Sequence, residues 1–290
     1  MIRLCCSNKQ IIFIKVLEKM NYVVRKLEIN DIKELSYYKF SEHKAVSTSY
    51  QFYSSLEDDE IVGNASVILS NHSHYEFKSK LGDFKEIAGF MVGDYYFNKP
   101  YIYCITNNNL FTYQVFNHEI MHGIDFYMNP KFKNSIFGGF TEIPTYTIDY
   151  LFLDFLEENN YNRNDIDALR RKKYDYIQKI ANDTILEINY LLKLKYESDN
   201  ISTTSCQNIC SVISNKIYNT LFELASCVIA EGLYRQILVD RKQGLKNLKT
   251  IMKNDFFNKE FPDFSLAKLD SYKLLQISSN MIGNKIKELK

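Results

Sequence analysis

The sequence FNHEIMHGIDF, at residues 116–126, contains the pattern His-Glu-x-x-His, formed by His118, Glu119 and His122. The chain has five histidines and 18 glutamates among its 290 residues. Scattered at random, these residues would produce about 0.005 matches to the pattern in a chain of this length. Chance is therefore a poor explanation, and the spacing calls for a chemical one.

The pattern fits one face of an α-helix. At about 100° per residue, His118 and His122 fall about 40° apart with Glu119 beside them, whereas Phe116 and Ile120 lie on the opposite side. Two histidines one turn apart can bind one Zn²⁺ ion, and the glutamate that flanks them is placed to take a proton from a water molecule. We therefore expect two zinc ligands and a general base. The alternative is a structural helix with two core histidines and a surface glutamate.

A catalytic zinc site needs a third protein ligand. No histidine follows His122 in the chain, so this ligand should be a carboxylate or else a thiolate. The segment GGFTEIPTYTIDYLF, at residues 138–152, offers Glu142 at the start of a second predicted helix. Thr141 is suited to cap this helix, and Pro144 to its first turn, where a missing N–H costs nothing. The sequence thus predicts one zinc ion per chain, bound by the two histidines and Glu142.

Two aspartates share a face with the predicted ligands. Asp149 lies two turns after Glu142 and could accept the outer N–H of His118 or His122, which would fix the orientation of that ring. Asp125 lies on the histidine face of the first helix and could act in the same way. The alternatives are a solvated helix residue for Asp149 and a loop cap for Asp125.

Composition narrows the class of protein. The net charge is +1, from 36 basic and 35 acidic residues, so neither nucleic acid nor an anionic membrane is expected as a partner. Six cysteines are too sparse for a disulfide scaffold and favour reduced thiols. No apolar run reaches transmembrane length, and the run at residues 11–14 is too short for a secretory signal. We therefore expect a cytoplasmic protein. Met20 is a second candidate for the start of the chain, and if Met1 is the start, residues 1–19 are expected to be disordered. The sequence does not predict the oligomeric state.

The 290 residues are expected to form a single domain, mainly α with a small β-sheet, an α+β fold. Residues 84–158 would form the core around the metal site, and residues 159–290 a helical part. Two short strands joined by a turn at Gly93 and Asp94 are predicted between residues 86 and 106. Helices are predicted at Asn30–Phe40, Glu57–Leu81, Phe111–Tyr127, Thr141–Glu158, Asp165–Glu197 and Gln207–Arg241, with shorter ones toward Lys290.

These motifs resemble a known family, the zinc peptidases of the thimet oligopeptidase and oligoendopeptidase F type. The His-Glu-x-x-His motif is one shared feature. The segment Glu142-Ile-Pro-Thr-Tyr-Thr-Ile-Asp149 is similar to the family's Glu-Val-Pro-Ser-x-x-x-Glu helix, and Gly89-Phe through Pro100-Tyr-Ile-Tyr is similar to the hairpin before its metal helix. The resemblance covers roughly the family's catalytic half. It implies a zincin-type catalytic domain of the gluzincin group, a metalloendopeptidase that acts on peptides or unfolded proteins.

The chain departs from the family pattern in several places. Met121 stands where the family usually has glycine, and Asp125 where it often has a further histidine. The family's downstream segment carries tyrosines that stabilise the oxyanion; the best match here has Phe222 at a key position, which leaves Tyr218 as the nearest substitute. The alternative function is therefore a catalytically weak, zinc-binding pseudopeptidase that acts as a binding or regulatory module.

Family members also carry a large amino-terminal helical lobe that roofs a narrow channel. These 290 residues have no room for it. The resemblance thus predicts a more open site, which would accept flexible loops of larger proteins as well as short peptides.

Overall fold

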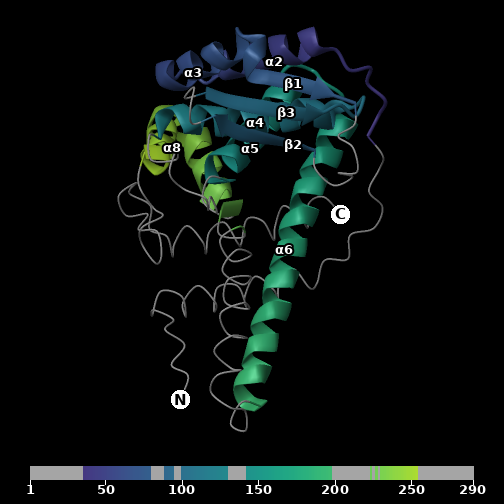
Figure 1. Ribbon diagram of the computed structural model, residues 1–290, viewed down its shortest axis with the longest axis vertical. Helices are drawn as coiled ribbons and strands as arrows, with labels where there is room; N and C mark the ends of the chain where they lie inside the picture. Colours follow the sequence, from purple (N-terminus) through teal and green to yellow (C-terminus); the bar gives the residue numbers. More distant parts are fainter. Residues whose placement is uncertain are drawn as a thin grey trace.

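The computed structural model describes residues 35–79, 88–94, 99–129, 142–197, 223, 226–227 and 229–253. Helices lie around a three-stranded sheet (Figure 1). The strands are β1 (Tyr75–Lys78), β2 (Gly89–Asp94) and β3 (Lys99–Ile105). The helices are α2 (Glu42–Ser55), α3 (Asp59–Leu69), the short 3₁₀ helix η1 (His72–His74), α4 (Leu110–Met128), α5 (Glu142–Glu158), α6 (Arg163–Glu197) and α8 (Arg241–Lys253); residues 229–239 are also helical. The predicted class, mainly α with a small sheet, is confirmed.

β3 is the central strand of the sheet, which has the order β1-β3-β2. It pairs in parallel with β1 and antiparallel with β2, so that Ile102 lies opposite both Tyr75 and Met91. Alternate side chains of β3 are buried, among them Ile102 and Cys104, as the two-residue period of a strand with one face on the core requires. Within the described residues β2 pairs on one side only, so its outer edge keeps free backbone groups.

α4 is the central helix of the fold. The side chain of Asn109 caps it by accepting a hydrogen bond of 3.2 Å from a first-turn backbone N–H. The helix packs against β2 and β3, and also against α3 and α5, so that Phe116 and Ile120 are fully buried. Only glycine allows β2 to approach this closely, because a Cβ on Gly89 would lie 2.7 Å from Val115 Cγ1. The motif helix is therefore held firmly between the sheet and its helical neighbours.

α5 packs against α4, and α6 packs against α5. Arg170 of α6 forms ion pairs with Asp154 and Glu157 of α5, at 2.9 and 2.7 Å. Beyond this junction α6 runs away from the sheet as one long rod (Figure 1). None of the helices that the structure describes is both long and apolar enough to cross a membrane.

The predicted helix at Asn30–Phe40 is wrong over residues 35–40, which are not helical. Their backbone is bound elsewhere: Tyr38 N–H donates to Asn108 O at 2.6 Å, and Phe40 N–H to Asn108 Oδ1 at 3.1 Å. Both rings pack against the same tyrosine of α4. These long-range contacts override the local helical pattern, and the first described helix is α2, which the sequence did not predict.

The predicted helix at Glu57–Leu81 is too long. α3 ends at Leu69, and the chain continues through η1 into β1, a strand that the sequence did not predict. β1 forms because its whole length pairs with β3, a partner more than twenty residues away. The predicted turn at Gly93 and Asp94 is also misplaced, since both residues belong to β2 and pair with the start of β3.

The other predicted elements agree with the structure. β2 and β3 are the two predicted strands, and α4, α5 and α6 begin and end within a residue or two of their predicted bounds. The helix predicted at Gln207–Arg241 is confirmed at residue 223 and over residues 226–227 and 229–239, and most of its earlier part lies outside the described residues. Thr141 and Tyr218 lie outside them as well, and the division of the chain at residue 159 stays a prediction.

Candidate metal centre

His118 and His122 of α4 meet Glu142 at the first turn of α5. His118 Nε2 lies 3.4 Å from Glu142 Oε2, and His122 Nε2 lies 3.4 Å from Glu142 Oε1. One nitrogen or oxygen from each residue lies within 4.8 Å of the other two. The structure thus brings together the three residues that the sequence predicted as ligands. No other such group of three histidine, cysteine or acidic side chains occurs in the part of the chain that is described.

The cluster fits a zinc ion. Zinc prefers two to three imidazole nitrogens and a carboxylate at about 2.0–2.2 Å, in a tetrahedral arrangement that places neighbouring donors roughly 3.4 Å apart. Each histidine Nε2 lies at about this distance from the carboxylate of Glu142, His118 from Oε2 and His122 from Oε1. The rings of His118 and His122 are inclined at 79°, with centroids 5.1 Å apart, so their Nε2 atoms approach the carboxylate from different directions. The donor set and its spacing are therefore compatible with a metal ion bound by these three residues.

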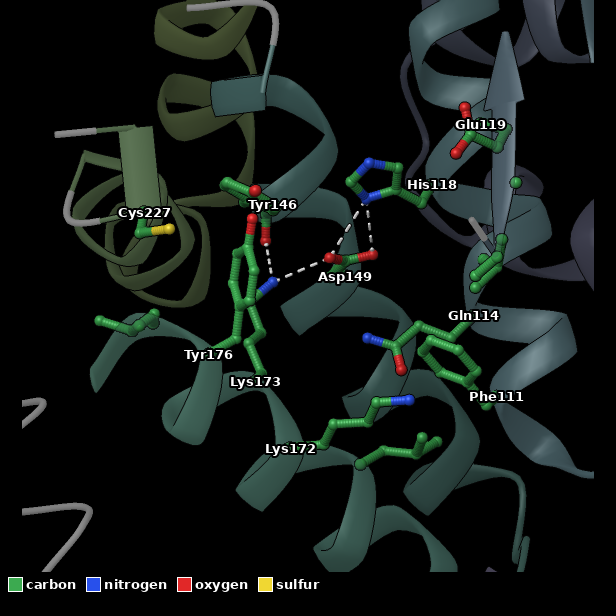
Figure 2. A pocket seen from close by; sticks show the side chains of 15 residues that line it. Phe111, Gln114, His118, Glu119, Tyr146, Asp149, Lys172, Lys173, Tyr176 and Cys227 are labelled. Atoms are coloured by element: carbon green, nitrogen blue, oxygen red, sulfur yellow. Dashed lines mark hydrogen bonds and ion pairs between the residues drawn. The ribbon is translucent and has the colours of Figure 1, made fainter. Parts of the chain in front are cut away.

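Asp149 holds the ring of His118 from behind. His118 Nδ1 lies 3.3 and 3.4 Å from the two carboxylate oxygens of Asp149, which leaves Nε2 for the cluster. Lys173 of α6 completes this arrangement, because its ammonium donates to Asp149 Oδ2 at 3.0 Å and to Tyr146 O at 2.9 Å (Figure 2). Asp149 lies where the sequence predicted it, whereas Lys173 was not predicted.

The charged groups of the cluster stabilise one another. Burial acts to lower the pKa of His118, but the carboxylates of Asp149 and Glu142 outweigh it and hold this pKa well above its ordinary value. Burial also acts to lower the pKa of His122, but the carboxylate of Glu142 outweighs it, so the pKa of His122 is raised. Burial would raise the pKa of Glu142, but the two histidines hold it well below its usual range. Each group is therefore stabilised in its charged form by its neighbours.

Glu119 lies beside the cluster without belonging to it. The residue is only 6% exposed, and its side chain faces the same cavity as His118. Burial raises the pKa of Glu119, and the two histidines oppose this increase. A buried carboxyl with a raised pKa can accept a proton and release it again, which is what a general base requires.

Asp125 is buried one turn after His122. Its Oδ1 atom has no hydrogen-bond partner among the described residues. Burial raises the pKa of this carboxyl to about 7, against the opposing effect of His122. The expected hydrogen bond from the His122 ring is not among the contacts of the described residues, and a role for Asp125 in holding that ring stays a prediction.

A cavity of about 430 Å³ opens onto the cluster; we call it the metal cavity. Besides Glu119 and the three clustered residues, it is lined by Gly89, Phe90 and Met91 of β2 and by Tyr146, Tyr176 and Glu223. The hydroxyls of Tyr146 and Tyr176 both donate to Glu223 Oε1, the former at 3.4 Å. The sequence assigned no role to Tyr146, and Tyr176 and Glu223 carried no signal because they come from distant helices.

No protein-family model matches the chain, and no curated protein matches it either. Its fold is similar to that of a candidate oligoendopeptidase F from Bacillus anthracis, at 15% identity and a TM-score of 0.66, over 99% of this chain and 56% of that one. It is also similar to PZ peptidase A, solved with an inhibitor, at 11% identity and a TM-score of 0.62, over 99% of this chain and 59% of that one. A third similar structure is a candidate peptidase from Chlamydophila abortus. The identity is 12% and the TM-score 0.64, over 97% of this chain and 56% of that one.

The chain spans a little over half the length of these solved structures. At such low identities the likeness establishes a common fold and leaves activity to be argued from the site. The predicted resemblance to the oligoendopeptidase F type is therefore confirmed at the level of the fold.

Proposed function

We propose that this chain is a zinc-dependent metalloendopeptidase that hydrolyses bonds within peptides or unfolded stretches of proteins. The observation that carries the proposal is the convergence of His118, His122 and Glu142, with Glu119 beside them in one cavity. The likeness of the fold to solved structures of peptidases supports it independently of the motif.

A zinc ion bound by the cluster would lower the pKa of a water molecule from about 15.7 to about 7 and polarise the scissile carbonyl. Glu119 would take the proton of the attacking water on a carboxylate oxygen and pass it to the nitrogen of the leaving amine, a role worth about 10²–10⁴ in rate. Asp149 keeps the His118 ring in the orientation that directs Nε2 into the metal cavity.

The substrate would lie along β2. Gly89, Phe90 and Met91 of this strand line the metal cavity, and the outer edge of β2 is unpaired within the described residues. An extended peptide that adds to such an edge is aligned by main-chain hydrogen bonds, which do not depend on its side chains. This arrangement would present the scissile carbonyl to the cluster and to Glu119.

The developing oxyanion needs a hydrogen-bond donor. Among the described residues, the hydroxyl-bearing ones that line the metal cavity are Tyr146 and Tyr176, and we propose that one of them takes this role. Tyr176 is the better candidate because it is 41% exposed, more than Tyr146. Tyr218, predicted from the sequence, lies outside the described residues.

One observation favours the alternative of a catalytically weak zinc-binding module. Both tyrosine hydroxyls donate to Glu223, so neither is directed at a substrate unless Glu223 releases it. Such a protein would bind zinc and peptide without turnover, and would act through binding alone.

Substitution of Glu119 tests the proposal. We expect Glu119→Gln to keep its zinc, because Glu119 is not among the three clustered donors, and to lose at least about 10²-fold in peptide cleavage. Zinc would be measured by elemental analysis and cleavage by mass spectrometry of a peptide library, with and without a chelator. Glu158→Gln, at an exposed position at the end of α5, is the control. Full zinc content with no cleavage by the unsubstituted protein would instead establish the alternative.

A further inference from the structure

A second cavity of about 430 Å³ adjoins the metal cavity, and we call it the Lys172 cavity. The two cavities share Gly89, His118, Glu119, Tyr146 and Tyr176 as lining residues, so a chain bound in one can extend into the other. The remaining walls are mainly apolar and come from α4 and α6, with Phe111, Val115, Leu169 and Ile177. Figure 2 shows this cavity with Lys172, Phe111 and Gln114 on the side away from Tyr146.

Lys172 brings an unpaired positive charge to this cavity. Its ammonium lies 3.3 Å from the centroid of the Phe111 ring, and it forms no ion pair with any residue that the structure describes. The next residue, Lys173, points toward Asp149 instead and is fully engaged there (Figure 2). Lys172 as a whole is exposed, and the partial burial of its ammonium lowers the pKa of this group.

Gln114 adds a neutral donor to the same cavity. Its side chain is buried, at 7% exposed, and forms no hydrogen bond to another described residue. Its amide atoms are not among the fully buried atoms that lack a partner, so they face the cavity and are available to a ligand there. Two carboxylates also line the cavity. Asp149 is paired with Lys173, and Glu119 lies in the wall that this cavity shares with the metal cavity.

We propose that the Lys172 cavity binds a carboxylate of the peptide substrate, through the Lys172 ammonium and the Gln114 amide. The inference rests on the proposed function, because the cavity would hold a residue of the substrate peptide that lies near the cleaved bond. Charge-assisted hydrogen bonds from a lysine are among the stronger polar contacts, and the apolar walls suit the methylene groups that precede a carboxylate. The carboxylate belongs either to an acidic side chain or to the free carboxy terminus of the peptide.

The test compares cleavage of matched peptides. One set of otherwise identical peptides carries Glu, Gln or Lys at successive positions around the cleaved bond, with amidated ends. A second set carries only Gln and ends at successive positions with a free or an amidated carboxy terminus. The first set reports an acidic side chain and the second a terminal carboxylate. The value of kcat/KM is measured for each peptide with the unsubstituted protein, Lys172→Met and Lys172→Glu.

We expect one position at which a carboxylate improves kcat/KM about tenfold over its neutral counterpart, as a hydrogen bond to a charged group does. Lys172→Met should abolish this preference, and Lys172→Glu should shift it to the Lys peptide. Lys179→Met is the control, since Lys179 is exposed on the same helix and does not line the cavity. Unchanged preferences in both Lys172 variants would overturn the inference while leaving the peptidase proposal intact.

Equilibrium binding separates the two proposals. If the unsubstituted protein cleaves no peptide, the proposed function fails, and the affinities of fluorescently labelled Glu and Gln peptides are then compared by anisotropy. Tighter binding of the Glu peptide that is lost in Lys172→Met would support the carboxylate site in a protein without turnover. Equal affinities for the two peptides would overturn it.

Discussion

Replacing Lys173 with methionine should destabilise the protein, because it leaves the buried carboxylate of Asp149 without its counter-charge. The side chains of Lys173 and Asp149 are 8% and 9% exposed, and their charged atoms lie 3.0 Å apart. The ammonium also donates to Tyr146 O at 2.9 Å and lies 4.0 Å from the centroid of the Tyr150 ring. Methionine can fill the volume but supplies none of these contacts.

The expected loss is about 3 kcal/mol in the free energy of unfolding. Removing one partner of a buried ion pair usually costs about 3–5 kcal/mol, because the remaining charge stays buried. The lower end applies here, since His118 still contacts Asp149 at 3.3 Å and can carry a positive charge in the zinc-free protein. The double substitution Lys173→Met with Asp149→Asn should lose less than the sum of the single ones, because no charge is left unpaired.

The loss should depend on pH. Burial alone would raise the pKa of Asp149, but Lys173, followed by His118, lowers it below its ordinary value. A carboxyl with a lowered pKa stabilises the fold above its unfolded pKa of about 3.9, and this contribution disappears as the pH falls through the folded value. The difference between the unsubstituted protein and Lys173→Met should therefore be full near neutral pH, shrink as the pH falls and Asp149 becomes protonated in the variant, and vanish only below the lowered pKa of Asp149 in the unsubstituted protein.

Urea unfolding followed by circular dichroism, in the presence of a chelator, measures these differences. Lys172→Met is the matched control, because this neighbouring lysine has a ring contact and no carboxylate partner, and its loss should cost at most about 1 kcal/mol. A loss below about 1 kcal/mol for Lys173→Met, or one that is the same at every pH, would refute the role of Lys173 as the counter-charge of Asp149.

Two further predictions concern the cluster and its surroundings. His122→Ala should lose bound zinc, whereas His72→Ala, at an exposed histidine outside the cluster, should keep it; elemental analysis after dialysis measures both, and equal zinc contents would contradict the assignment. Asp125→Asn should stabilise the zinc-free protein by about 2–4 kcal/mol at pH 8 and by much less near pH 5, because a carboxyl with a folded pKa of about 7 is disfavoured in its ionised form above that pH. Urea unfolding at the two pH values measures the effect, and a variant that is less stable at pH 8 would indicate a bound partner for the Asp125 carboxylate.

The metal cluster could be predicted because its information is local. His118, Glu119 and His122 lie within two turns of one helix, and Glu142 opens the next described helix. A helix places residues three and four apart on one side whatever lies around it, so the spacing alone defines the face that carries the ligands. Asp149, two turns after Glu142, follows from the same periodicity.

The surroundings of the cluster could not be predicted because they come from distant parts of the chain. Lys173 and Tyr176 lie on α6, and Glu223 lies later still, so their approach depends on how these helices pack. The same reason explains the errors in secondary structure. β1 exists through its pairing with β3, and the stretch before α2 is held by hydrogen bonds to Asn108, a partner nearly seventy residues away.

The charges of the metal cavity link its structure to the proposed chemistry. Three carboxylates, Glu119, Glu142 and Glu223, face a cavity with two imidazoles, while Asp149 and Lys173 balance each other behind it. Without an ion, the neighbouring carboxylates raise the pKa of both histidines, so that each imidazole can be protonated and positively charged. A divalent ion would replace these protons, because zinc binds imidazole only in its neutral form. The cavity would then keep one net negative charge, and a proton that passes from a water molecule to Glu119 would move this charge from the Glu119 carboxylate to the resulting hydroxide. The charge needed to hold the ion and the charge needed for the general base are therefore supplied by the same small set of residues.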